Sequence, residues 1–297
     1  MVHGSCLCGA VRYEADAPFK WMAYCHCSMC RKSEGGLFNT SLGVPKEQFR
    51  WISGETDIAR YQSAEKSHRD FCKHCGSSVP HELQDNGIVG IPAGGLEDDP
   101  GIKPQAHIFV GSKSKSYVFS DSLPQFPTWP GGDSIPSVNR PAPELKADVV
   151  QGSCLCGGIA FEIDEQPTRM VNCHCSRCRR SRGTAHGTNF FVDKTKLRWV
   201  RGADKLKTYK VPDAKVFATS FCGDCGSVMP ASFDAIGTYL VPVGSIDTPL
   251  TLTPAVNIQV GSKAPWFTVD DSLPQFEAMP PRERMAEFLF DWAALKK

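Results

Sequence analysis

The sequence lacks the features that mark membrane-spanning, secreted and nucleic-acid-binding chains. No apolar run approaches the roughly 18 residues needed to cross a bilayer, and the opening stretch MVHGSCLCGAVRYEADAP has no basic segment followed by an apolar one. No block of like charge occurs, and 33 Lys and Arg residues against 32 Asp and Glu residues leave a net charge of +1. We therefore expect a cytoplasmic protein with no membrane or nucleic-acid partner. The sequence indicates no oligomeric state.

Long helical patterns are equally scarce. Short runs rich in β-branched and aromatic residues, each bounded by Gly, Pro or Asp, predict strands instead. Examples are AVRYEAD (10–16), GIVGIPAG (87–94), AHIFVG (106–111) and SYVFSD (116–121). The exception is the C-terminal segment 281–297, where Met285, Phe288, Leu289, Trp292 and Leu295 recur at helical spacing after a proline pair. This pattern predicts one short amphipathic helix in a mainly β protein.

The chain contains an internal duplication. GSCLCGAVRYE (4–14) returns as GSCLCGGIAFE (152–162), CHCSMCRKS (25–33) as CHCSRCRRS (173–181), and FCKHCGSSVP (71–80) as FCGDCGSVMP (221–230). Each copy is the size of a domain, so we expect each to have its own core. We predict a first repeat at 1–127, a Pro- and Gly-rich linker at 128–150, a second repeat at 151–280 and the helix at 281–297.

Cysteine is abundant: 14 residues, seven in each repeat. Without a secretion signal we expect a reducing compartment, where clustered cysteines bind metal rather than form disulfides. The first repeat holds Cys6, Cys8, Cys25, Cys27, Cys30, Cys72 and Cys75, and the second holds Cys154, Cys156, Cys173, Cys175, Cys178, Cys222 and Cys225. Because four thiolates complete a structural zinc site, seven divide naturally into four and three.

Spacing indicates which four belong together. Cys6 and Cys8, two residues apart on a strand, point to the same face, and the CxxC pair Cys72 and Cys75 forms a turn that presents two sulfurs to one metal. The two pairs together predict a closed structural zinc site. The equivalent set in the second repeat is Cys154, Cys156, Cys222 and Cys225.

The remaining three cysteines predict a different kind of site. Cys25 and Cys27 from an extended piece and Cys30 from a tight turn would hold a zinc ion with one position open, as catalytic zinc sites do. Three thiolates on a divalent ion carry a net charge of −1, which suits a soft fourth ligand such as a substrate thiol. We therefore expect glutathione or a similar small thiol as substrate. The second repeat offers Cys173, Cys175 and Cys178 for the same purpose.

The ordered motifs GSCLCG, CHCxxCR, FCxxCG and DSLPQF, present once in each repeat, resemble the glutathione-dependent formaldehyde-activating enzyme family, which also includes centromere protein V. The resemblance implies tandem zinc-binding β-tent domains with the two zinc sites per repeat given above. It also implies a carbon–sulfur lyase that condenses glutathione with formaldehyde, or acts on another aldehyde or a glutathione adduct. The alternative is a non-catalytic binding module of the centromere protein V type, in which every zinc ion only stabilises the fold.

Several polar residues near the cysteines allow two interpretations of their role. Arg31 and Lys32, with Arg179 and Arg180 in the second repeat, could bind the carboxylates of glutathione or form a solvated face. His26 and His174 sit between predicted ligands, and alternation favours a packing role over acid–base work. The repeats also differ: His107 corresponds to Asn257, and Ser116 to Trp266. We therefore expect the two three-cysteine sites to differ in activity.

Overall fold

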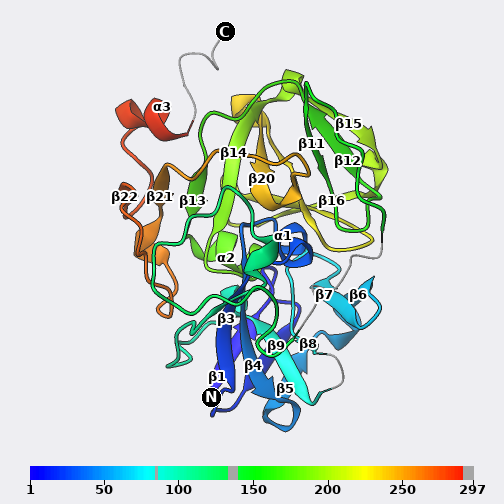
Figure 1. Cartoon of the computed structure of the whole chain (residues 1–297), viewed down its shortest axis with the longest axis vertical. Coiled ribbons are helices and arrows are strands. Elements are labelled where there is room, and N and C mark those ends of the chain that lie inside the picture. Colours follow the sequence, from blue (N-terminus) through cyan, green and yellow to red (C-terminus); the bar gives the residue numbers. More distant parts are fainter. Residues whose placement is uncertain (84–85, 133–139, 290–297) are drawn as a thin grey trace.

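The structure, a computed structural model, describes residues 1–83, 86–132 and 140–289. Sheets dominate both repeats, and only short helices connect them, which confirms the predicted mainly β fold class. In Figure 1 the first repeat lies below and the second above, and α1 (Ser28–Glu34) and α2 (Ser176–Arg182) lie where the repeats meet. Within the described residues, no helix has the length and apolar content needed to cross a bilayer.

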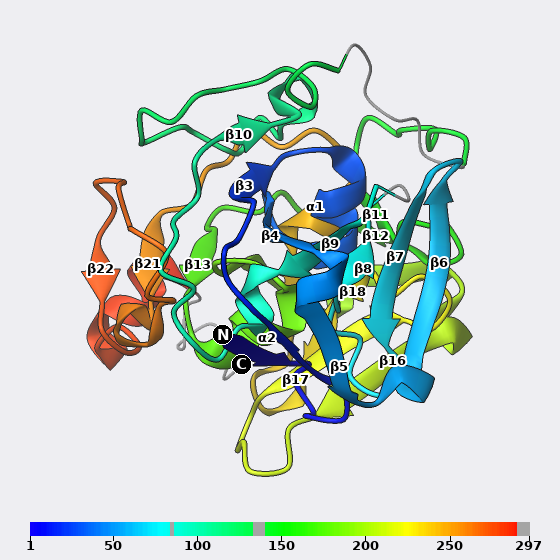
Figure 2. The same cartoon turned by 90° about the horizontal axis from the view of Figure 1, so that it is seen from below.

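The first repeat consists of two sheets and a hairpin. Its strands are β1 (Val2–Ser5), β2 (Arg12–Ala15), β3 (Trp21–Cys25), β4 (Asn39–Pro45), β5 (Phe49–Ser53), β6 (Ile58–Ala64), β7 (Ser67–Cys72), β8 (His81–Glu82), β9 (Ile88–Pro92) and β10 (His107–Ile108). They form the sheets β1-β2-β5 and β10-β3-β4-β9-β8, beside the β6–β7 hairpin. Figure 2 shows this hairpin at one side of the repeat.

The second repeat follows a similar plan. Its strands are β11 (Val150–Ser153), β12 (Ala160–Ile163), β13 (Val171–Cys173), β14 (Gly187–Asp193), β15 (Leu197–Arg201), β16 (Leu206–Lys210), β17 (Ala218–Cys222), β18 (Val228–Met229), β19 (Ala231–Phe233), β20 (Thr238–Pro242), β21 (Val256–Ile258) and β22 (Gln275–Phe276). The sheets are β11-β12-β15, β19-β20-β14-β13-β21-β22 and β16-β17-β18. In both repeats a short helix connects the two strands of a central antiparallel pair. Helix α1 connects β3 to β4, and α2 connects β13 to β14.

A cysteine caps the N-terminus of α1 and of α2. The backbone of Cys27 is extended, and its Sγ accepts a hydrogen bond from the amide of Cys30 at 3.3 Å, which caps α1. The helix ends after seven residues at Gly35, whose φ of 67° lies in the left-handed region that glycine tolerates. Cys175 and Gly183 bound α2 in the same way. The tight turn predicted at Cys30 is therefore the first turn of a helix.

The C-terminal segment bears out only part of the predicted helix. A 3₁₀ turn at Arg282–Arg284 leads into α3 (Met285–Phe288). Phe288 and Leu289 pack against Val256 and Ile258 of β21. The rest of the predicted helix, including Trp292 and Leu295, lies outside the described residues.

One predicted strand is wrong. The runs at 10–16, 87–94 and 106–111 contain β2, β9 and β10, but 116–121 pairs with no strand in the described part of the chain. The alternation of inward-facing and exposed side chains in 116–121 does not come from strand pairing. Tyr117 and Phe119 turn toward the ring of His26, with centroids 4.6 and 5.8 Å away, while Val118 is exposed. Aromatic packing, rather than a ladder of hydrogen bonds, holds this segment.

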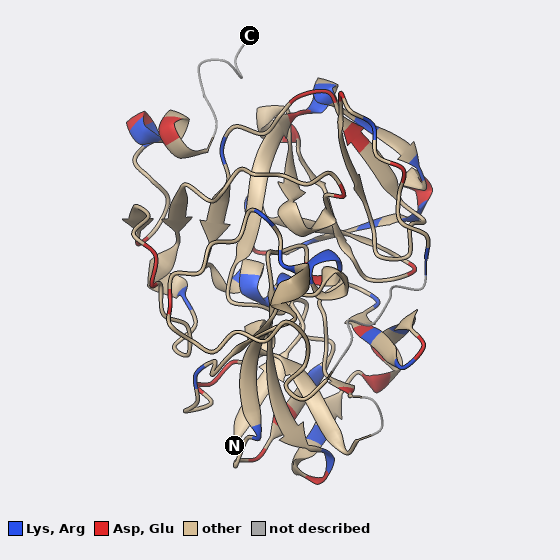
Figure 3. Ribbon diagram, viewed as in Figure 1, with Lys and Arg blue, Asp and Glu red and all other residues tan. Residues whose placement is uncertain are grey.

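The repeats exchange contacts through their helices. Helix α1 packs on the 3₁₀ turn Val243–Ser245 of the second repeat, and α2 packs on the equivalent turn Ala93–Gly95 of the first. Lys32 Nζ lies 2.8 Å from Asp247 Oδ1, and its counterpart Arg180 lies 3.3 Å from Glu97 Oε1. Figure 3 shows the basic residues of both helices gathered at this junction.

The predicted separate cores are not observed. The largest cluster of buried side chains spans both repeats and includes Met22, Leu42 and Ile91 of the first and Phe161 and Phe190 of the second. Two smaller clusters lie apart from it, one in each repeat. Because each helix packs on the other repeat, the apolar surfaces of the two repeats meet and are buried together. The repeat and linker boundaries stay a prediction, and residues 133–139 of the predicted linker lie outside the described chain.

Candidate active site

The structure brings together the first predicted set of four cysteines. The Sγ atoms of Cys6, Cys8, Cys72 and Cys75 all lie within 4.8 Å of one another. Cys6 follows β1, Cys72 ends β7, and the site joins these two elements. Cys8 Sγ lies 3.4 Å from Cys6 Sγ and 3.7 Å from Cys72 Sγ. The second set, Cys154, Cys156, Cys222 and Cys225, groups in the same way.

These separations fit a tetrahedral zinc site. Zinc–sulfur bonds of about 2.3 Å place tetrahedral ligands about 3.8 Å apart, whereas a disulfide would hold two sulfurs at about 2.0 Å. All 14 cysteines are free. Backbone amides also point at the sulfurs: Val11 N lies 3.4 Å from Cys6 Sγ, and Ile159 N lies 3.2 Å from Cys154 Sγ. The cysteine ligands, the distances between their sulfurs and the backbone N–H groups that point at them all fit thiolates bound to a metal ion.

The predicted sets of three cysteines also assemble. Cys25 is the last residue of β3, Cys27 caps α1 and Cys30 lies in its first turn, and their Sγ atoms lie within 4.8 Å of one another. Cys173, Cys175 and Cys178 form the same arrangement at the end of β13 and the start of α2. We call these the first and second triads. Within the described residues, no fourth His, Cys, Asp or Glu ligand joins either group.

An arginine accompanies each triad, half-buried Arg69 beside the first and buried Arg182 beside the second. Arg69 of β7 donates from Nη2 to Cys30 Sγ at 3.6 Å. Burial opposes its charge, but the thiols of Cys30 and Cys27 outweigh burial and raise the pKa of Arg69. Beside the second triad, burial lowers the pKa of Arg182, and the thiol of Cys178 offsets part of this. A divalent ion bound by three thiolates carries a net charge of −1, and a cation beside it compensates for that charge.

These two arginines occupy non-equivalent positions. Arg69 corresponds to Thr219 in the second repeat, and Arg182 corresponds to Glu34 in the first. Arg182 donates to the carbonyl of Gly35 at 3.0 Å and to Asn189 Oδ1 at 2.7 Å. The surroundings of the two triads have therefore diverged, although the cysteines match.

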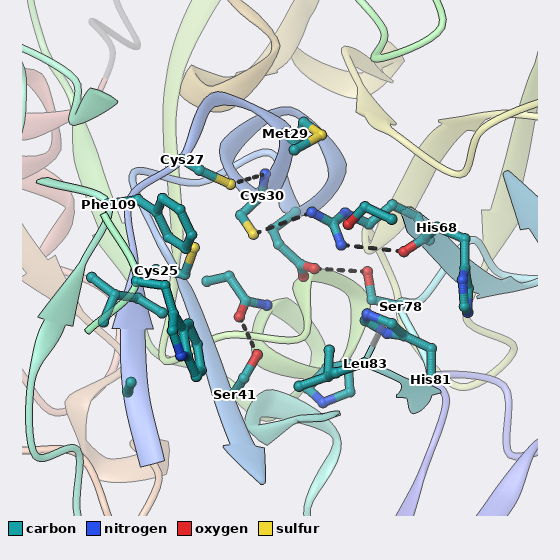
Figure 4. A pocket seen from close by; sticks show the side chains of 18 of the residues that line it. Cys25, Cys27, Met29, Cys30, Ser41, His68, Ser78, His81, Leu83 and Phe109 are labelled. Carbon is teal, nitrogen blue, oxygen red and sulfur yellow. Dashed lines mark hydrogen bonds between the residues drawn. The ribbon is translucent and has the colours of Figure 1, made fainter. Parts of the chain in front are cut away.

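A cavity of about 370 Å³ lies beside the first triad. Figure 4 shows the three cysteines at one side of it, with His68, Ser78 and His81 across from them. Its wall includes Trp21, Met29, Cys25, Cys27, Cys30, Glu34, Asn39, Ser41, Lys66, Arg69, Leu83, Phe109 and Trp129. An apolar and aromatic lining with a few polar groups is typical of a small-molecule site.

Glu34, the last residue of α1, is a carboxyl group in the wall of this cavity. It is 4% exposed, and its Oε1 accepts a hydrogen bond from Ser78 Oγ at 3.0 Å. Burial raises the pKa of Glu34 to about 8, against the opposing effects of Ser78 and Arg69. The group is therefore protonated at neutral pH.

His81 faces the same cavity in its neutral form. Burial lowers its pKa to about 3, and the charge of Arg69 adds to this effect. Its ring lies 5.4 Å from that of His68, centroid to centroid. The cavity thus offers a neutral imidazole and a protonated carboxyl close to the guanidinium of Arg69.

The histidines between the cysteines point away from the sulfurs into a buried chain of hydrogen bonds. His26 Nε2 lies 2.8 Å from His107 Nδ1, and His107 Nε2 lies 3.0 Å from Asp121 Oδ1. In the second repeat His174 bonds Asn257 at 2.9 Å, and Asn257 donates to Asp271 at 2.7 Å. Asn257 thus replaces His107 within a similar chain. Both chains fasten the cysteine segment to the strand beside it.

The four cations predicted to bind glutathione are bound within the protein. Arg31 donates to the carbonyls of His26 and Ser112 at 3.2 and 3.0 Å, and Arg179 donates to that of Ser262 at 3.2 Å. Lys32 and Arg180 form the ion pairs between the repeats described above. A role for these four residues in binding glutathione stays a prediction.

Sequence reasoning missed the polar residues of the cavity. None of Glu34, Arg69 and His81 was predicted as a site residue. Comparison of the two repeats does distinguish these residues. Arg182, Thr219 and Ala231 stand at the positions of Glu34, Arg69 and His81, so these groups occur in one copy only.

Comparison with known proteins agrees with the cysteine pattern. A family described as glutathione-dependent formaldehyde-activating enzyme matches residues 1–112 and 149–262. An uncharacterized lyase of Schizosaccharomyces pombe is 29% identical over 76 residues, which are 26% of this chain and 53% of that protein. A putative glutathione-dependent formaldehyde-activating enzyme of Halomonas elongata is 30% identical over 86 residues, 27% of this chain and 54% of that protein.

Among solved structures, a crystal structure of a Rhodobacter sphaeroides protein is 27% identical, with a TM-score of 0.29 over 33% of this chain and 89% of that one. The matched segments span about half the length of the two curated relatives. The family match, in contrast, covers most of both repeats, with all 14 cysteines inside it. The chain therefore belongs to the glutathione-dependent formaldehyde-activating enzyme family.

Proposed function

We propose that the protein is a zinc-dependent carbon–sulfur lyase or synthase that acts on glutathione and an aldehyde, or on a glutathione adduct, at the first triad. One observation carries this proposal. Three sulfurs with no fourth ligand among the described residues form part of the wall of a cavity, while four other cysteines per repeat form a separate closed set. An open and a closed sulfur site in one repeat are the expected division between catalytic and structural zinc.

Zinc held by the first triad would supply an open position with affinity for a thiolate. The protein's own residues would bind the rest of the substrate. Lys66 and Arg69 are the basic residues in the described wall of the cavity, and both are suited to the carboxylates of glutathione. Arg69 also touches Cys30 and so would stabilise negative charge at the sulfurs. The rings of Trp21, Phe109 and Trp129 would exclude water from the reacting groups.

The proposal predicts that the zinc-loaded protein accelerates the combination of glutathione with formaldehyde. The rate can be followed by exchange NMR with isotopically labelled formaldehyde, because the free aldehyde and the hydroxymethyl adduct give separate signals. S-methylglutathione, which has both carboxylates but no thiol, is the matched control and should give no adduct. An exchange rate equal to that of the uncatalysed mixture would contradict the proposal and leave a zinc-stabilised binding module as the alternative.

A further inference from the structure

We propose that Glu34 is the proton-holding catalytic residue of the first triad, giving its proton to the oxygen of an aldehyde as the carbon–sulfur bond forms and regaining the proton that the thiol loses. This inference rests on the proposed function and makes it more specific. It names the substrate as a small aldehyde whose carbonyl oxygen becomes a hydroxyl group.

The Glu34 carboxyl group has a fixed position beside the first triad. Glu34 ends the helix whose cap and first turn carry Cys27 and Cys30, so helix α1 holds it at a fixed place relative to two of the sulfurs. It lines the same cavity as the triad. Ser78 donates to one of its oxygens and fixes the orientation of the group.

The second carboxyl oxygen of Glu34 differs from the first in its surroundings. Glu34 Oε2 is buried and has no hydrogen-bond partner among the described residues. A side chain at Gly183 would place its Cβ 2.6 Å from this oxygen, so the bare backbone of Gly183 gives the carboxyl group its room. A buried carboxylate with one oxygen unpaired is costly, whereas a protonated carboxyl can exist there. The site therefore favours a group that keeps its proton.

Two guanidinium groups act on Glu34 from other elements. Arg69 approaches from β7 and Arg182 from α2, and both act to lower the pKa of the group, as do Ser78 and Asn39. The other cations of α1 point elsewhere: Arg31 to two carbonyls and Lys32 to Asp247. Burial outweighs these effects and leaves the pKa near neutral, where an acid–base group works best.

The proposed step balances. The sulfur lone pair attacks the aldehyde carbon, and a carbon–sulfur bond forms as the π bond of the carbonyl breaks. The protonated Glu34 carboxyl gives its proton to the carbonyl oxygen, and the proton that the thiol loses returns to the Glu34 carboxylate. The product is a hydroxyalkyl thioether of glutathione, and Glu34 is again protonated. In the reverse direction Glu34 gives its proton to the departing sulfur and takes the hydroxyl proton, so no further reactant is needed.

The test is the pH dependence of kcat/KM for zinc-loaded wild type and Glu34→Gln, a substitution that preserves size and hydrogen bonding but cannot transfer a proton. We expect Glu34→Gln to lose about 100-fold in rate and to lose the pH dependence that the wild type shows near the Glu34 pKa. Its zinc content should be unchanged. Glu34→Asp should recover part of the rate. Glu14→Gln, on the surface of the same repeat and paired with Arg50, is the matched control.

Thermal unfolding adds a readout that does not depend on activity. A raised pKa in the folded state means that the folded protein binds the proton more tightly than the unfolded chain. Wild-type stability should therefore fall as pH rises from the ordinary Glu pKa of 4.5 to about 8. The Tm of Glu34→Gln minus that of the wild type should grow across this window and then level off, and Glu14→Gln should show no such trend.

The outcomes separate the two proposals. If the wild type catalyses the reaction but Glu34→Gln has the same rate and pH profile, the role of Glu34 is overturned and the proposed function stands. A flat Tm difference between pH 4.5 and 8 would also overturn it, because Glu34 would then not hold the proton. If the wild type is inactive with every aldehyde tried, the proposed function itself fails.

Discussion

Cys27→Ser is expected to abolish activity, with a loss on the order of 1,000-fold, whereas Cys175→Ser should leave most of it intact. The two residues are equivalents, and each caps a helix with its sulfur. Serine is itself a favoured helix cap, so both variants should fold. Only the first triad, however, has Glu34 and Arg69 beside it, and in the second repeat Arg182 and Thr219 replace them.

The measurement is the initial rate of each variant at saturating glutathione, with zinc content determined on the same samples. Each protein should lose about one zinc ion, so that the two variants differ in activity and not in metal loss. If each substitution halves the rate, the triads are two independent and competent sites. If Cys175→Ser alone abolishes activity, the site lies in the second repeat and the assignment is wrong.

Cys6→Ser is expected to destabilise the first repeat far more than Cys25→Ser. Cys6 is 1% exposed and belongs to the closed set that ties β1 to β7. Because metal binding at such a site is coupled to folding, its loss should remove on the order of 5 kcal/mol, comparable with the whole stability of a domain. The first triad lies on one continuous segment, β3 to α1, so its loss should cost about 1–2 kcal/mol.

Urea unfolding followed by circular dichroism measures the difference, and chelation supplies a second test. The protein should carry up to four zinc ions, of which a mild chelator removes two without unfolding it. The matching substitutions in the second repeat, Cys154→Ser and Cys173→Ser, should show the same contrast. Equal destabilisation by Cys6→Ser and Cys25→Ser would mean that both sites are structural.

The cysteine grouping could be predicted because it follows from short-range geometry. Two residues on one strand face, or two in a CxxC turn, point at the same place whatever the rest of the chain does. Strands with strong local patterns, such as 87–94, were predictable for the same reason. The segment 116–121 also has a strand-like local pattern. Tyr117 and Phe119, however, face an aromatic cluster, and the backbone of this segment pairs with no strand among the described residues. Local pattern does not reveal whether a pairing partner exists.

Long-range features account for the remaining differences. The core shared by the two repeats forms because α1 and α2 each pack on the other repeat, and no local signal indicates this exchange. Lys32 appeared free for a ligand because its partner, Asp247, lies more than 200 residues away in the sequence. Glu34 was not predicted as a site residue because its burial depends on Ser78 and on the backbone of Gly183. The spacing of cysteines in the sequence identifies the metal ligands. It does not identify the polar side chains that lie beside them, because these are brought there by long-range packing.

The central claim is that the first triad leaves one position on its metal for the sulfur of the substrate. The most direct test is the visible spectrum of the cobalt-substituted protein during titration with glutathione, using Cys175→Ser to isolate the first triad. We predict that glutathione changes both the ligand-field bands and the sulfur-to-cobalt charge-transfer band, while S-methylglutathione leaves them unchanged. A spectrum that does not respond to glutathione, at concentrations where calorimetry shows it bound, would contradict the claim.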